Sequence, residues 1–136
     1  MKRSLTDYLI ISLKGMAMGA ADVVPGVSGG TIAFISGIYE ELIESLNNIN
    51  SAAFKELKSK GFKHTWDKLN GAFLLALMFG VLTSIFSLTK GVEWFLEHHP
   101  ILLWAFFFGL VAASIVYISK QIKATLWDLA GLKVFL

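Results

Sequence analysis

The sequence contains no cysteine, only two prolines and few charged residues. Without cysteine the chain has neither disulfide bonds nor thiolate metal ligands. Charged residues make up 16% of its 136 residues, whereas an ordinary globular domain has about 25%. The formal net charge of +2 is too small for a typical nucleic-acid-binding protein, so no nucleic-acid partner is expected. The chain is instead 55% hydrophobic and 13% aromatic, a balance that excludes a disordered chain and predicts a membrane environment.

Two long apolar segments predict transmembrane helices. Residues 69–89 carry no charge, and a helix of that length, at about 1.5 Å per residue, spans the roughly 30 Å hydrocarbon core of a bilayer. Residues 98–119 form the second segment, with Pro100 at a position that suits the first turn of a helix. Neither segment has a polar stripe, which argues against the alternative of two buried helices in a water-soluble protein.

The distribution of lysine predicts the orientation of these segments, because short cytoplasmic loops are enriched in Lys and Arg. Residues 47–68 hold five lysines and are predicted to be a cytoplasmic loop. Residues 90–97 hold one lysine and two glutamates, which predicts an exterior loop. Residues 120–136, the start of a following segment, carry lysine again and return the chain to the cytoplasm. The N-terminus also begins with two basic residues, so residues 1–46 must leave the membrane on the side where they enter it.

A glycine-rich turn inside residues 1–46 predicts how these residues enter and leave the membrane on the same side. Residues 22–31 (DVVPGVSGGT) combine a proline, three glycines and two hydroxyls, so a helix cannot continue through them. Broken backbone at membrane depth is tolerated only where protein buries it or where it lines a wet cavity. The predicted fold is therefore all-α: one polytopic membrane domain, residues 1–136, with a re-entrant helical hairpin followed by two transmembrane helices.

The hairpin is expected to contain two helices. The first runs from about 7 to 21 and is capped by Thr6 or Asp7; the second runs from about 31 to 46 and is capped by Ser28 or a neighbour. Small residues spaced four apart, which allow close helix packing, are Gly15, Gly19, Ala33 and Gly37.

The run from Lys14 to Glu40 (KGMAMGAADVVPGVSGGTIAFISGIYE) resembles the signature of a bacterial and archaeal membrane family, the PopT-type undecaprenyl phosphate translocases. His99-Pro100 and residues 106–110 (FFFGL) resemble the same family. The resemblance implies a multi-pass protein of the inner (cytoplasmic) membrane, a transporter or flippase that returns this lipid carrier to the cytoplasmic leaflet for cell-wall synthesis. Members are longer and carry a second Pro-Gly-x-Ser-Gly motif. This chain resembles their N-terminal half, and we expect it to work as a homo-oligomer or with a complementary C-terminal half.

The glycine-rich turn is the candidate binding site for the phosphate of such a polyprenyl-phosphate lipid. Glycines allow main-chain N–H groups to approach an anion, and the following helix N-terminus adds its dipole. Ser28 and Thr31 could donate hydroxyl hydrogen bonds, and Lys14 could supply charge by snorkelling along the hairpin. The expected site residues are Lys14, Asp22, Pro25, Gly26, Ser28, Gly29, Gly30 and Thr31. The alternative is that the glycines only form a tight turn and Ser28 only caps a helix.

Two carboxylates flank the hairpin. Asp22 is interpreted either as a proton or cation relay or as a cap of the turn, whereas Glu40 is expected to be solvated. The adjacent histidines His98 and His99 diverge on a helix and make a poor metal pair, so neither a metal nor a cofactor is expected.

An enzyme and a packing module are the alternative function classes. The pentapeptide at residues 26–30 (GVSGG) fits the G-x-S-x-G pattern of a hydrolase, but that pattern needs a preceding strand and a base within reach. His64 and the pair at 98–99 fall on opposite predicted sides of the membrane, and the chain has no Walker A sequence. We therefore predict a transporter rather than an enzyme, with a non-transporting membrane assembly module as the alternative.

Overall fold

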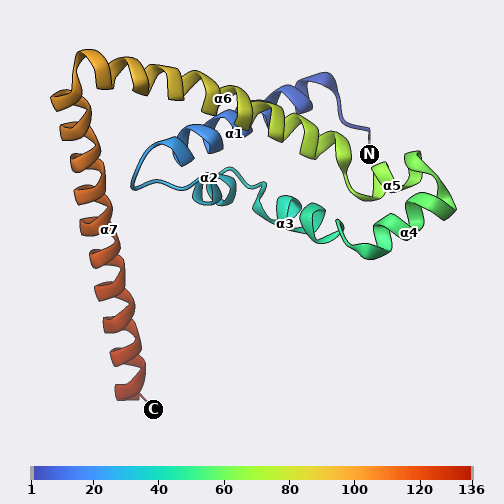
Figure 1. The fold of residues 1–136 in the computed structure, drawn as a ribbon. Helices are drawn as coiled ribbons and strands as arrows, with labels where there is room; N and C mark the ends of the chain where they lie inside the picture. Colours follow the sequence, from blue (N-terminus) through green and yellow to red (C-terminus); the bar gives the residue numbers. More distant parts are fainter. Residues whose placement is uncertain (1, 136) are drawn as a thin grey trace.

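The computed structural model describes residues 2–135, and the side chains of residues 2–131. These residues form helices and no strand, which confirms the all-α prediction (Figure 1). The seven helices are α1 (Leu5–Val23), α2 (Gly29–Ile35), α3 (Tyr39–Asn47), α4 (Ser51–Lys60), α5 (Phe62–Lys68), α6 (Gly71–His98) and α7 (Pro100–Phe135).

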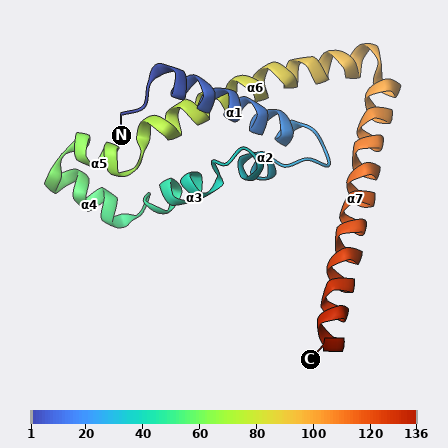
Figure 2. The ribbon, with the colours of Figure 1, turned by 180° about the vertical axis from the view of Figure 1, so that it is seen from behind.

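Helices α1 and α6 lie side by side along most of α1 and run in the same direction (Figures 1 and 2). Their backbones touch at glycines. A Cβ atom at Gly15 would overlap the carbonyl oxygen of Leu77, and a Cβ atom at Gly80 would lie 2.8 Å from the carbonyl carbon of Ser12. Gly19 approaches α6 in the same way. The close packing predicted for Gly15 and Gly19 is therefore confirmed, and only glycine allows the two helices to come this near.

The first helix begins earlier than predicted. Ser4, rather than Thr6 or Asp7, is the N-cap of α1. The Ser4 hydroxyl accepts a hydrogen bond from the Asp7 N–H at 3.3 Å, and the Asp7 carboxylate accepts one from the Ser4 N–H at 2.8 Å. This is a capping box, which satisfies two backbone donors that the helix itself leaves free.

The second helix of the hairpin, predicted from about 31 to 46, is instead two helices, α2 and α3. Gly37 has a φ of +76°, and its N–H donates to Phe34 at 3.2 Å, while the N–H of Ile38 donates to Ala33 at 3.0 Å. This pair of bonds is a Schellman motif, which ends α2 because its left-handed residue cannot continue a helix. Gly37 therefore makes a turn, and a Cβ atom there would touch nothing, so its predicted role in helix packing is wrong.

Both ends of the hairpin meet at the start of α6. The Arg3 guanidinium forms an ion pair with Glu41 of α3 and lies over the ring of Phe73 at 5.3 Å. The side-chain amide of Asn70, the N-cap of α6, donates to the same Glu41 carboxylate at 2.7 Å. Residues 3 and 41 therefore lie together beside the first turn of α6.

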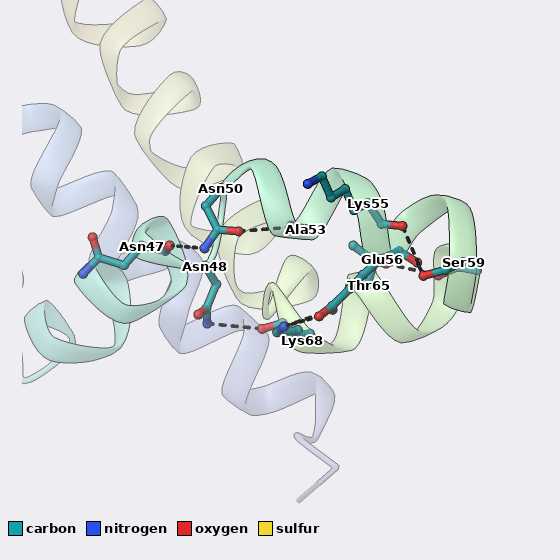
Figure 3. A network of polar contacts seen from close by, with 10 residues as sticks. Asn47, Asn48, Asn50, Ala53, Lys55, Glu56, Ser59, Thr65 and Lys68 are labelled. Carbon is teal, nitrogen blue, oxygen red and sulfur yellow. Dashed lines mark hydrogen bonds and ion pairs between the residues drawn. The ribbon is translucent and has the colours of Figure 1, made fainter.

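The predicted loop at residues 47–68 contains two short helices, α4 and α5, joined by polar contacts (Figure 3). The Asn50 side chain caps α4 by accepting from the Ala53 N–H at 3.1 Å. The Lys68 ammonium donates to both oxygens of Glu56, at 2.8 and 2.9 Å, and lowers the pKa of that carboxyl group. Because the pKa of Glu56 is lowered in the folded chain, the ion pair between Lys68 and Glu56 is present near neutral pH. It weakens as the pH falls through the pKa of Glu56.

The two predicted spans are both helical and longer than expected. Both α6 and residues 100–131 of α7 are long and apolar enough to cross a membrane, and their most apolar 18-residue stretches have mean hydropathies of 2.1 and 2.4. The predicted exterior loop at residues 90–97 belongs to α6, and residues 120–135 continue α7 instead of starting a new segment. The described part of α7 beyond its contact with the hairpin extends away from the other helices (Figures 1 and 2).

Candidate functional site

The hairpin reverses direction at a tight turn formed by residues 24–27. Pro25 and Gly26 occupy its centre, Gly26 has a φ of +89°, and the N–H of Val27 donates to the carbonyl of Val24 at 3.4 Å. Proline followed by a residue of positive φ is typical of a type II turn, which requires glycine at the second position. The carbonyl of Gly26 accepts a hydrogen bond from the Ser114 hydroxyl at 2.8 Å, so the turn is fixed against α7.

Asp22 caps the helix that follows the turn. Its carboxylate accepts a hydrogen bond from the Gly29 N–H at 2.7 Å, and a Cβ atom at Gly29 would lie 2.6 Å from the other carboxylate oxygen. Ser28 is the N-cap residue of α2, as predicted, but its side chain makes no capping hydrogen bond. The capping interaction proposed for Asp22 is therefore observed, and Asp22 supplies the acceptor that Ser28 was expected to provide.

Lys14 is bound at the opposite end of α2. Its ammonium donates to the carbonyl of Ser36 at 2.8 Å, where a cation suits the negative end of the helix dipole. Two charged residues of α1, Asp22 and Lys14, therefore hold the two ends of α2. The seven residues of α2 separate Lys14 from the turn, so the structure does not bring Lys14 together with the other expected site residues.

The remaining polar groups of the turn face outward. Ser28, Gly30 and Thr31 are exposed, and a Cβ atom at Gly30 would meet only the Ser28 hydroxyl, at 3.5 Å. Since the Gly29 N–H donates to Asp22, the donors that remain at the turn among the described residues are two hydroxyls and the peptide N–H groups of Gly30 and Thr31. Pro25 is exposed as well, and so is Glu40, as predicted.

An apolar cavity of about 440 Å³ adjoins the turn at Val24, the residue before Pro25. Its walls come from the end of α1, the last turns of α6 and the first turns of α7. The lining residues are Val24, Leu88, Gly91, Val92, Phe95, Leu102, Leu103, Phe106 and Phe107. Sequence reasoning missed this cavity, because it depends on how α6 and α7 meet.

The surroundings of Ser28 and of the histidines bear on the hydrolase and metal-site alternatives. Ser28 follows a turn between two helices, and no strand precedes it in the part of the chain that is described. His98 stacks on Trp94 with ring centroids 4.7 Å apart, and His64 lies in α5. Among these residues no group of three or more His, Cys, Asp or Glu side chains is arranged to hold a metal ion.

Comparison with known proteins identifies relatives of the chain. A sequence model of the family described as undecaprenyl phosphate translocase-like matches residues 18–136. The chain belongs to this family. The translocase-like match includes the glycine-rich turn, α6 and α7, but begins after Lys14. No solved structure matches the chain.

Two curated relatives are named polyprenyl-phosphate transporters. The chain is 49% identical to the one from Vibrio cholerae serotype O1 over 130 residues, and 38% identical to the one from Staphylococcus aureus over 108 residues. These matches cover 92% and 79% of this chain but only 42% and 34% of the relatives, so the chain spans less than half of their length. With two helices long enough to cross a bilayer, this member of the translocase-like family is a membrane protein.

Proposed function

We propose that the chain is part of a transporter that moves polyprenyl phosphate across the cytoplasmic membrane and returns this lipid carrier for cell-envelope synthesis. The observation that carries the proposal is the junction at Val24, where exposed polar groups of the turn adjoin a wholly apolar cavity. A polyprenyl phosphate has the same two parts, an anionic head and a hydrocarbon tail. The names of the relatives support this substrate class.

The turn provides the head with polar partners that lipid cannot offer. An unpaired charge in hydrocarbon is very costly unless hydrogen-bond donors surround it. The hydroxyls of Ser28 and Thr31 and the N–H groups near Gly30 are the donors of the turn, while Val24 and its neighbours receive the first prenyl units. Because α1 has 19 residues, or about 28 Å of helix, a hairpin that enters from the cytoplasm carries the turn toward the outer leaflet.

Asp22 sets the charge at this site. Its carboxylate caps α2 through Gly29, and its negative charge lies beside the position proposed for the phosphate. Two like charges beside each other repel. We propose that Asp22 binds a proton or a cation when the phosphate binds. Asp22 would then act both as a relay and as the cap of α2.

Asp22→Asn is therefore expected to bind farnesyl phosphate more tightly than the wild type, while its thermal stability stays unchanged. Asparagine keeps an oxygen that accepts from the Gly29 N–H but removes the charge. Asp22→Ala is the matched control, because it removes both charge and acceptor and should lower stability by about 1 kcal/mol. Isothermal titration calorimetry and thermal unfolding in neutral detergent measure the two quantities. Weaker binding by Asp22→Asn would contradict a phosphate beside Asp22.

Single cysteine substitutions test the proposed orientation, in which residues 47–68 and 120–136 face the cytoplasm and residues 90–97 face the exterior. The chain has no cysteine of its own, so background labelling is absent. Lys58→Cys and Lys123→Cys should react with an impermeant thiol reagent only after cells are permeabilised, and Glu93→Cys should react in intact cells. These outcomes follow from the distribution of lysine over residues 47–68, 90–97 and 120–136. Labelling of Lys58→Cys from outside, with Glu93→Cys protected, would show the inverted orientation.

We further propose that the chain acts with a second copy or a complementary half. The described side chains of α7 beyond Ser114 are all exposed, and α7 contacts the turn through the hydrogen bond from Ser114 to Gly26. Irregular backbone inside a membrane must be surrounded by protein or by a wet cavity, because lipid offers no hydrogen-bond partners. A second copy or a complementary half would supply that protein.

A further inference from the structure

A second cavity lies at the opposite end of α6 from the turn. Its volume is about 620 Å³, within the usual range of ligand sites. It is bounded by the N-terminal residues, by α5 and by the first turn of α6. Three cationic side chains, Lys2, Arg3 and Lys63, line it against one carboxylate, that of Asp67.

Two of these cations are available to a ligand. The ion pairs among the described residues are Arg3 with Glu41 and Lys68 with Glu56, so Lys2 and Lys63 are in none. Arg3 is held in place by its ion pair and by its position over the Phe73 ring. The cavity therefore combines one fixed cation with two free ones, and it favours an anionic ligand.

The surroundings of the cavity are suited to a membrane surface. Trp66 lines the cavity and packs against Gly71, where a Cβ atom would lie 2.5 Å from the indole. Phe62 stacks on Trp66 with ring centroids 5.6 Å apart, yet it is 68% exposed, and Phe54 on α4 is 70% exposed. Exposed phenylalanines among the lysines of α4 and α5 are typical of helices that lie in the interface of an anionic membrane.

We propose that this cavity binds the anionic, phosphate-bearing headgroup of a lipid in the cytoplasmic leaflet. Basic pockets beside transmembrane helices on the cytoplasmic side bind such headgroups. The inference rests on the orientation given under the proposed function, which places the start of α6 at that leaflet. The headgroup belongs either to a resident phospholipid or to the translocated lipid phosphate, since both offer the same phosphate oxygens to Lys2 and Lys63.

The test measures binding of three probes to the whole chain in neutral detergent by isothermal titration calorimetry. The probes are dihexanoyl phosphatidylglycerol, dihexanoyl phosphatidylcholine and farnesyl phosphate. Lys63→Gln is the test variant, and Lys58→Gln is its matched control, because Lys58 carries the same charge but lies outside the cavity. Lys63→Gln should weaken phosphatidylglycerol binding about ten-fold, the effect of losing a hydrogen bond to a charged group, and Lys58→Gln should leave it unchanged.

The farnesyl phosphate results then distinguish the two sources. If farnesyl phosphate competes with phosphatidylglycerol, and if Lys63→Gln weakens its binding, the lipid phosphate is an occupant of the cavity. If farnesyl phosphate does not compete, the cavity is a phospholipid site. Equal binding of phosphatidylglycerol and phosphatidylcholine, or equal effects of Lys58→Gln and Lys63→Gln, would overturn the cavity site. In that case, farnesyl phosphate binding that still depends on Gly29 would leave the proposed function standing.

Discussion

Gly80→Ala is expected to force α1 away from α6 and to destabilise the fold by about 3 kcal/mol, the upper part of the usual range for overpacking. The added Cβ atom would lie 2.8 Å from the Ser12 carbonyl carbon and 2.9 Å from the Met16 nitrogen. Both are backbone atoms of α1, so no side-chain rotation relieves the overlap. The shift would also stretch the hydrogen bond from the Ser12 hydroxyl to the Ala76 carbonyl, now 2.9 Å. Thermal unfolding in detergent, followed by circular dichroism, measures the loss.

Gly91→Ala is the matched control for this substitution. Gly91 lies on the same helix, but a Cβ atom there would meet nothing within 4 Å. Alanine in a helix interior is about 1 kcal/mol more favourable than glycine, so this variant should be slightly stabilised. Equal destabilisation by Gly80→Ala and Gly91→Ala would contradict the close packing of α1 on α6.

Gly29→Val is expected to abolish the binding of lipid phosphate while the hairpin still inserts. A side chain at Gly29 would push against the Asp22 carboxylate, whose nearest oxygen lies 2.6 Å from the Cβ position. It would also cover the first N–H groups of α2, beside the Ser28 hydroxyl. We expect farnesyl phosphate affinity to fall more than a hundred-fold, because several hydrogen bonds to a charged group are lost together.

Two further variants show whether the loss of farnesyl phosphate affinity in Gly29→Val is specific to the turn. Gly131→Val is the control, because a Cβ atom at Gly131 has open space around it and the residue lies far along α7. Ser28→Ala removes one hydroxyl and should cost about ten-fold to a hundred-fold in affinity, the effect of a single hydrogen bond to a charged group. If Gly29→Val and Ser28→Ala both bind normally in a correctly inserted chain, the hairpin is a packing device.

The beginnings of the apolar helices could be predicted from the sequence, but their ends could not. Pro100 marks the start of α7, and the predicted start at residue 69 is within two residues of Gly71, where α6 begins. The apolar pattern ends each helix where charge returns, at Lys90 and Lys120. Charged residues end a hydrophobic span, yet lysine and glutamate are good helix formers, so both helices continue past them.

The parts of the candidate site differ in how far the sequence determines them. Proline and glycine in the turn follow from local backbone geometry, so Pro25 and Gly26 could be placed correctly. The break at Gly37 has a local signal too, a serine followed by glycine at the end of a short helical run, but the apolar pattern around it favours one continuous helix. The contact of Lys14 with Ser36 could not be predicted, because it depends on where α2 ends and how α2 packs on α1.

The most direct test compares farnesyl phosphate with farnesol as ligands of the purified chain. The two lipids share one tail and differ only in the phosphate, so their difference in affinity measures head recognition alone. A turn that binds the head should favour the phosphate at least about ten-fold, as expected for a hydrogen bond to a charged group, and Gly29→Val should remove that preference. Equal affinities for farnesyl phosphate and farnesol in the wild type would contradict a phosphate site at the glycine-rich turn.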